Sequence, residues 1–444
     1  MINFNIIDKS SCCIPHNGSN DLNHLPVAII GAGPIGLAAA AHLADRGEPF
    51  ILVESGENVG SNIRQWGHVR LFSPWQYNID KIARKLLENN NWIAPPADEL
   101  PLGKELVELY LEPLSELPQI HPHILFNSVV TAISKKGLDK MKNVGRENTS
   151  FVIYLEQDGT TTRVEAKAVI DASGTWSHPN PVNTDNVWTL EEKALLKHIY
   201  YGIPNTTTMR DKYSHKRVAV IGGGHSAINT ILELSESGSQ ELFWIMRKKK
   251  VEDAYGGEEK DALEARGELD SRIHQLVDSG KVKPITPLYI QQLKETATGV
   301  RIIGQFNGKH FEQEVDEVIA NTGSRPDFSF LREIRLSVDA GTESVEALST
   351  LIDPNLHSCG TVRPHGEEIL RQPEKNFYIV GMKSYGRAPT FLMATGYEQV
   401  RSVVAYLCGD LEASKTIELD LPETGVCSTN IKVSQADSSC CGAC

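Results

Sequence analysis

Long apolar runs and an excess of basic residues are both missing from this 444-residue sequence. Hydrophobic residues make up 40% of the chain and charged residues 23%, and the formal net charge is -13. A membrane span needs about 20 consecutive apolar residues, and nucleic acids or anionic membranes attract basic surfaces. We therefore expect neither a membrane span nor a nucleic-acid partner. Residues 1–20 also lack a basic region followed by an apolar stretch, so we expect a cytoplasmic location.

Cysteines are few and unevenly placed. Two lie near the N-terminus, two are internal, and four fall within residues 427–444. They are Cys12, Cys13, Cys359, Cys408, Cys427, Cys440, Cys441 and Cys444. In a reducing cytosol these are thiols by default, so we expect no disulfide framework.

Two glycine-rich turns, about 190 residues apart, are the most informative features present. Each follows a short apolar run and precedes a helical pattern, which is the context of a dinucleotide site. The first turn is Gly31-Ala32-Gly33-Pro34-Ile35-Gly36, and the second is Gly222-Gly223-Gly224-His225-Ser226-Ala227. Glycines permit the tight turn and close backbone approach, while the helix N-terminus offers free N–H groups to phosphates. The sequence therefore predicts two bound dinucleotides, of which the simplest pair is a flavin and the nicotinamide that reduces it.

The residue that follows the next strand differs between the two turns. After the first turn it is Glu54, an acid placed to hydrogen-bond a ribose hydroxyl. After the second it is Arg247, followed by Lys248 and two further lysines, which would pair with a 2′-phosphate. These residues assign the flavin's adenosine to the first turn and NADPH, rather than NADH, to the second. The alternative for the basic run is a solvated strand end.

The order of elements predicts an α/β fold with two Rossmann-like domains. We expect an NADPH domain inserted in a split FAD domain, because the segments on either side of the second unit resemble the exit and return crossings of a known flavoprotein family. Strands are predicted at residues 50–53, 164–170, 241–246, 318–320 and 377–380, and a helix from about Thr395. The predicted boundaries are a flexible N-terminal arm (1–24), an FAD domain in two parts (25–185 and 323–420), a helical insertion (78–118), an NADPH domain (186–322) and a cysteine-rich tail (421–444).

At this point the chain resembles the two-dinucleotide-binding flavoproteins, and most closely the flavin-containing monooxygenase group. Beyond the turns, residues 172–181 resemble the strand that leaves the flavin domain, and residues 321–327 resemble the return crossing. Residues 59–75 resemble the segment between the adenosine and the flavin ring. The resemblance implies further FAD contacts at Ser55, Ser73, Val130, Ser173, Gly174, Gly323, Gly381 and Thr395. Arg64, Arg70 and His68 are candidate polar groups near the flavin ring or its phosphates, and each could equally be a surface or packing residue. A helix starting near Thr395 would direct its positive end at the flavin.

The chain also departs from the patterns of related families. Glutathione-reductase-like enzymes carry Cys-x4-Cys after the first turn, and small thioredoxin reductases carry Cys-x-x-Cys after the second. Neither is present, and Met382 stands where related reductases have an Asp after Gly381. The linker at Tyr200-Tyr201-Gly202 also lacks the His of the monooxygenase pattern. The fate of the flavin's electrons is therefore the open question.

The C-terminal cysteines supply one answer. Cys440, Cys441 and Cys444 resemble the delivery pair of mercuric reductases, and a soft metal(loid) ion favours such thiolates. A structural zinc site and an exposed tail with incidental cysteines are the alternatives.

We expect an FAD-dependent, NADPH-oxidising enzyme, monooxygenase-like and acting with oxygen on a small substrate. The alternative is an NADPH-dependent reductase of thiols, disulfides or thiophilic metal(loid)s that uses these three cysteines as a relay. A redox-sensing protein with negligible turnover is a third hypothesis, and a homodimer is left open.

Overall fold

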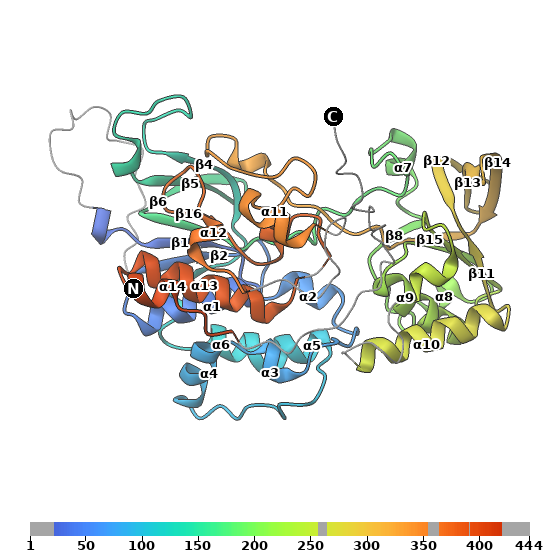
Figure 1. The fold of residues 1–444 in the computed structure, drawn as a ribbon, viewed down its shortest axis with the longest axis horizontal. Helices are drawn as coiled ribbons and strands as arrows, with labels where there is room; N and C mark the ends of the chain where they lie inside the picture. Colours follow the sequence, from blue (N-terminus) through green and yellow to red (C-terminus); the bar gives the residue numbers. More distant parts are fainter. Residues whose placement is uncertain (1–21, 256–263, 354–363, 390, 420–444) are drawn as a thin grey trace, which may run out of the picture.

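Two α/β bodies lie side by side in the computed structural model (Figure 1). The structure describes residues 22–255, 264–353, 364–389 and 391–419. Each body has a parallel five-stranded sheet with helices on one face and a three-stranded antiparallel sheet on the other. The fold is the predicted one, an α/β protein with two Rossmann-like cores.

The first sheet collects strands from both ends of the chain. Its order is β16 (Phe377–Ile379), β7 (Ala168–Asp171), β1 (Val27–Ile30), β2 (Phe50–Val53) and β3 (Ile124–Leu125). All its pairs are parallel, with Ile30 opposite Val53 and Asp171. Strands β1, β2 and β7 are buried throughout, as expected for a sheet covered on both faces.

Helices cover one face of this sheet and a small sheet covers the other. The helices are α1 (Pro34–Asp45), α13 (Met393–Leu407) and α14 (Leu411–Lys415), with α11 (Glu346–Ile352) and α12 (Glu367–Leu370) nearby. The small sheet is β4 (Val129–Lys135), β5 (Phe151–Gln157) and β6 (Thr160–Ala166). Its Phe151 meets Phe377 of β16, with 6.3 Å between ring centroids, so all three layers share one core.

Residues 78–118, predicted to be helical, contain short helices beside α1 and α13 (Figure 1). They are α3 (Trp75–Asn78), α4 (Lys81–Glu88), α5 (Gly103–Leu106), a π-helical turn (Val107–Leu111) and α6 (Glu112–Ser115), after α2 (Ser61–Gln65). Asp80 caps α4 by accepting from the backbone N–H groups of Ile82 and Ala83, and it also pairs with His42 of α1 at 3.1 Å. One carboxylate thus starts α4 and fixes it on α1.

The second sheet is built from residues between β7 and β16. Its order is β11 (Val282–Ile285), β10 (Glu241–Ile245), β9 (Arg217–Ile221), β15 (Glu317–Ala320) and β8 (Ile199–Tyr201). One face packs on α9 (His225–Glu236) and α10 (Glu264–Asp278), and the other on β12 (Leu288–Glu295), β13 (Val300–Phe306) and β14 (Lys309–Val315). Short helices α7 (Leu190–Ala194) and α8 (Arg210–Tyr213) complete this body.

Two predicted elements need correction. The strand predicted at residues 164–170 is two strands, because the chain leaves the antiparallel sheet after Ala166 and enters the parallel sheet at Ala168. Lys167 between them donates from its backbone N–H to the Pro26 carbonyl and pairs with Glu48 at 2.6 Å. The helix predicted from Thr395 begins two residues earlier, at Met393.

Some predicted features lie outside the described residues. These are most of the N-terminal arm with Cys12 and Cys13, Cys359, and the tail with Cys427, Cys440, Cys441 and Cys444. No helix in the described part of the chain is long and apolar enough to cross a membrane. The described residues also contain no group of three acidic, histidine or cysteine side chains that could hold a metal ion.

Candidate functional site

The first glycine turn joins β1 to α1 and is shaped for close approach of a ligand. Gly31 has φ +97°, and a Cβ there would lie 2.9 Å from the Ala172 carbonyl oxygen, so the turn requires glycine. A Cβ on Gly33 would meet open space. The N-terminus of α1 has no side-chain cap, so its first N–H groups are available to a phosphate. This cradle fits the pyrophosphate of FAD.

Glu54 at the end of β2 lies against this turn. Its carboxylate accepts from the backbone N–H of Ala32 at 2.7 Å and from that of Gly56 at 2.8 Å. The Ser128 N–H donates to the Glu54 carbonyl at 2.9 Å, which brings the start of β4, and thus Val130, beside the acid. The Ser55 hydroxyl also donates to this carboxylate at 3.4 Å, and a carboxylate has about four lone-pair sites, so one remains for a ribose hydroxyl. The structure therefore gathers the turn, Glu54 and Val130 at one end of the sheet.

The loop after β16 closes the site from the other side. Gly381 has φ +68°, and a Cβ there would lie 3.1 Å from Ile35 of α1. Gln399 of α13 is fully buried and accepts from the Gly381 N–H at 2.7 Å. Thr395 is buried one turn earlier in the same helix. These contacts hold Gly381 and α13 against the first turn, and an FAD contact by Gly381 or Thr395 stays a prediction.

Sequence reasoning missed a buried ion pair beneath this loop. Lys383 Nζ lies 2.6 Å from Asp171 Oδ2, and both side chains are fully buried. Asp171 also accepts from the Ser173 hydroxyl at 2.6 Å, and Lys383 Nζ lies 3.1 Å from that same hydroxyl. The pair therefore shapes the segment at Ser173 and Gly174, where β7 leaves the flavin domain. A lysine four residues after the buried strand β16, and two after Gly381, was the available signal.

Three predicted FAD residues instead contact the helical insertion. Arg64 pairs with Glu112 of α6, and Arg70 donates to the Leu100 carbonyl at 2.5 Å. The Ser73 hydroxyl donates to Asn78 at 2.7 Å. Their side chains thus have partners within the protein, and a direct FAD contact by any of them stays a prediction.

The second glycine turn joins β9 to α9 and has the same features as the first turn: one glycine in close backbone contact, one facing open space, and an uncapped helix N-terminus. A Cβ on Gly222, where φ is +144°, would lie 2.4 Å from the Asn321 carbonyl oxygen. A Cβ on Gly224 would meet open space, and α9 has no side-chain cap. Ala227 is fully buried, whereas Ser226 is exposed. The turn offers free N–H groups to a second pyrophosphate.

The basic residues Arg247 and Lys248 after β10 differ in whether their side chains already have a partner within the protein. Arg247 is exposed and makes no hydrogen bond or ion pair with any described residue. Lys248 donates to the Asp253 carbonyl at 2.5 Å, so its ammonium is already engaged. Arg247 is therefore the better placed of the two to bind a 2′-phosphate.

Two paired crossings connect the bodies. Residues 172–181 and 321–325 run antiparallel, with Pro179 opposite Ser324 and the Asn180 N–H donating to the Gly323 carbonyl at 2.9 Å. Residues 59–75 also reach across: the rings of Trp66 and Trp176 lie 6.2 Å apart. Burial lowers the pKa of His68 in this segment. Both glycine turns thus belong to one connected unit.

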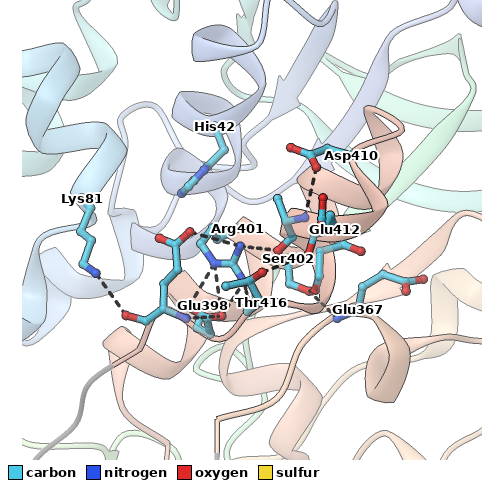
Figure 2. A network of polar contacts seen from close by, with 12 residues as sticks. His42, Lys81, Glu367, Glu398, Arg401, Ser402, Asp410, Glu412 and Thr416 are labelled. Atoms are coloured by element: carbon cyan, nitrogen blue, oxygen red, sulfur yellow. Dashed lines mark hydrogen bonds and ion pairs between the residues drawn. The ribbon is translucent and has the colours of Figure 1, made fainter.

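A well-defined cavity lies elsewhere in the described part of the chain. It has a volume of about 500 Å³ and lies near the C-terminal half of α1, beside the start of α4 and α13. Figure 2 shows that its charged groups are engaged: Arg401 reaches Glu398 at 2.6 Å, and Lys81 reaches the Glu418 carbonyl at 3.1 Å. Residues 34 to 42 of α1 span roughly 12 Å, which separates the cavity from the glycine turn. The cavity is therefore not the dinucleotide site.

Two uncapped glycine turns, one followed by an acid and the other by an arginine, define a flavoprotein with two dinucleotide sites, which binds FAD and NADP(H). The model of the pyridine nucleotide-disulphide oxidoreductase family matches residues 28–350, and the chain belongs to this family. It is an oxidoreductase with a flavin and a nicotinamide cofactor.

Comparisons with individual proteins agree with this class. The chain is 24% identical over 394 residues to a ferredoxin–NADP reductase of Lactobacillus johnsonii, covering 88% of this chain and 96% of that protein. A bacillithiol disulfide reductase of Bacillus cereus has a similar structure, with a TM-score of 0.65 and 20% identity over 87% of this chain and 99% of the other. The structure of an ornithine N-hydroxylase of Kutzneria sp. 744 is also similar, with a TM-score of 0.59 and 16% identity, covering 88% of this chain and 100% of the other. The two structures show the fold.

Proposed function

We propose that this protein is an NADPH-oxidising flavoenzyme whose reduced flavin passes its electrons directly to an acceptor that is not part of this chain. The observation that carries the proposal is the position of the one described cysteine. Cys408 follows α13 at its C-terminal end, and the 15 residues of that helix span roughly 22 Å from the Gly381 side. Burial raises the pKa of its thiol to about 11, which disfavours the reactive thiolate at neutral pH.

The assignment of the two nucleotides supports the direction of electron flow. Glu54 favours the adenosine of FAD at the first turn, and the unengaged Arg247 favours a 2′-phosphate at the second. FAD held at the first turn would supply the hydride-accepting chemistry, and NADPH held at the second would be the hydride donor. The protein's part is to hold both nucleotides on one rigid connection and to decide which acceptor reaches the flavin.

The predicted monooxygenase is one form of this proposal, with molecular oxygen as the acceptor. The structural similarity to a protein described as an ornithine N-hydroxylase supports this form. The relatives described as ferredoxin–NADP reductases support a second form, in which a one-electron iron–sulfur protein is the acceptor. The alternative reductase of thiols or metal(loid)s would need Cys440, Cys441 and Cys444, which lie outside the described residues.

Acceptor-dependent NADPH oxidation tests the proposal on the full-length, FAD-loaded protein. The acceptors are oxygen with candidate amines, a small iron–sulfur protein, a low-molecular-weight disulfide, and Hg(II). The same set is measured on a variant with Cys440, Cys441 and Cys444 replaced by serine. We expect turnover that the replacement leaves unchanged. Turnover confined to the disulfide or Hg(II), and lost in the triple variant, would overturn direct transfer in favour of the thiol relay.

A further inference from the structure

A buried acid faces the second glycine turn. Asp270 of α10 is fully buried, and neither of its carboxylate oxygens has a hydrogen-bond partner among the described residues. Its Oδ1 lies 3.3 Å from Nε2 of His225, the first residue of α9. An unsatisfied carboxylate inside a protein is costly unless a cation or donors offset it. The arrangement therefore needs a charge partner, and His225 is the group within reach.

His225 is held from two directions. Asp270 faces it from α10, and the ring of Phe72, from the segment that crosses from the flavin body, packs edge-on at 5.6 Å between centroids. The His225 side chain is 25% exposed. It directly follows Gly224, at a helix N-terminus that no side chain caps. Because Nε2 faces the carboxylate, Nδ1 is the remaining polar atom of the ring.

The chemistry of imidazole links these observations to a diphosphate. In the imidazolium form both ring nitrogens donate hydrogen bonds. Nε2 can then donate to Asp270 while Nδ1 donates to an anion bound by the N–H groups of α9. A buried carboxylate and a bound phosphate would repel each other if nothing lay between them. A protonated His225 between them would attract both the Asp270 carboxylate and the phosphate.

We propose that Asp270 is a positioning residue of the NADPH site, which holds His225 as a cationic donor to the pyrophosphate of NADPH. The proposal rests on the proposed binding of NADPH at the second glycine turn. It adds Asp270 of α10, which is not part of the glycine motif, to the residues expected to support NADPH binding. It also predicts that Asp270 and His225 act as a unit, so removing either loses the same contribution.

The test is the binding of two nucleotides to the full-length, FAD-loaded protein. NADP⁺ carries both the pyrophosphate and the 2′-phosphate, whereas 2′-AMP carries the 2′-phosphate alone. Asp270→Asn keeps the side-chain shape and removes the charge. One hydrogen bond to a charged group corresponds to about 10- to 100-fold in affinity. We expect Asp270→Asn to raise the dissociation constant of NADP⁺ by that factor and to leave that of 2′-AMP unchanged.

Two further variants complete the design. His225→Gln should give the same loss, and the double variant should lose no more than either single one. Glu317→Gln is the matched control, because Glu317 is another acid beside a histidine, with 3.5 Å between its Oε1 and His198 Nδ1. It begins β15, opposite Val218 at the start of β9, so it lies at the far end of the sheet from Gly222. We expect it to leave both dissociation constants unchanged.

The outcomes separate this inference from the function on which it rests. Unchanged or tighter NADP⁺ binding in Asp270→Asn would overturn the inference, since tighter binding is what simple repulsion by Asp270 gives. A parallel loss of 2′-AMP binding would overturn it too, because a general distortion of the domain explains that result. A wild-type protein that binds neither NADP⁺ nor 2′-AMP would overturn the NADPH site itself. If Asp270→Asn does not fold, His225→Gln decides by the same criteria.

Discussion

Lys383 and Asp171 form a fully buried ion pair, with 2.6 Å between Nζ and Oδ2, although 212 residues separate them in the sequence. The pair joins the loop after β16 to the end of β7, and so connects the two parts of the first sheet. Lys383 Nζ also lies 4.4 Å from the ring centre of Phe330. The pair also reaches the Ser173 hydroxyl, and so shapes the segment that leaves the flavin body toward the second one.

Removing one partner of this pair should be strongly destabilising. Lys383→Met leaves an uncompensated charge on Asp171, and breaking a buried pair in this way costs about 3–5 kcal/mol. We expect a lower thermal unfolding midpoint and loss of retained FAD, measured by differential scanning fluorimetry and flavin absorbance. The double variant with Asp171→Asn should recover much of the loss, because the lone charge is gone. Equal stability of Lys383→Met and the wild type would show that the pair is not a structural link.

The two glycine turns should be separable by substitution. A Cβ on Gly31 or Gly222 would collide with a backbone carbonyl, at 2.9 and 2.4 Å respectively. We expect Gly31→Ala to lose FAD, and Gly222→Ala to retain FAD but lose NADP⁺ binding, as measured by flavin absorbance and calorimetry. Gly47→Ala is the matched control, since Gly47 also has positive φ but open space around it. It should cost about 1–2 kcal/mol of stability and keep both ligands.

Arg247 should set the preference between the two nicotinamide cofactors. Its replacement by Ala removes a charged contact to the 2′-phosphate worth about 1.5–3 kcal/mol. We expect NADP⁺ affinity to fall by roughly 10- to 100-fold, with little change for NAD⁺. Arg272→Ala, an exposed arginine of α10 that pairs with Glu236, is the control and should change neither. If Arg247→Ala leaves the ratio of NADP⁺ affinity to NAD⁺ affinity unaltered, a residue other than Arg247 binds the 2′-phosphate.

Much of this architecture could be predicted from local sequence signals. The turns at Gly31 and Gly222 follow apolar runs, and the order of strand, turn and helix survives folding because it is local. The break at Lys167 could not be predicted, because residues 164–170 form one continuous strand-like run and only pairing in three dimensions separates its two parts. The partners of Asp171 and Asp270 were missed for a related reason. Each depends on elements that meet only after the sheets have assembled.

The exposed basic residues were the least predictable part of the candidate site. Arg64 and Arg70 lie in the segment that resembles a flavin contact, yet their partners come from the helical insertion. Long flexible side chains bind whichever carboxylate or carbonyl the tertiary structure brings near. Sequence position alone therefore identified the segment but not the partners of its side chains.

Cys408 should behave as an unreactive thiol with a defined alkaline signature. Burial raises its pKa from 9.0 to about 11, so the folded state keeps the thiol protonated where the unfolded chain ionises. Its contribution to stability is full below about pH 9 and is lost as the pH rises toward 11. We expect wild-type protein to lose more thermal stability than Cys408→Ala between pH 8.5 and pH 10.5. Parallel pH profiles would contradict the buried, protonated thiol.

The most direct test of the account is an anaerobic reductive titration of the FAD-loaded, full-length protein, followed by flavin absorbance. Without a redox-active dithiol in electronic contact with the flavin, two electrons per FAD complete the reduction. A thiol relay built from Cys440, Cys441 and Cys444 would store two more. Direct transfer to an external acceptor predicts an end point at two electrons, unchanged when the three cysteines are replaced by serine. An end point at four electrons that falls to two in that variant would contradict it.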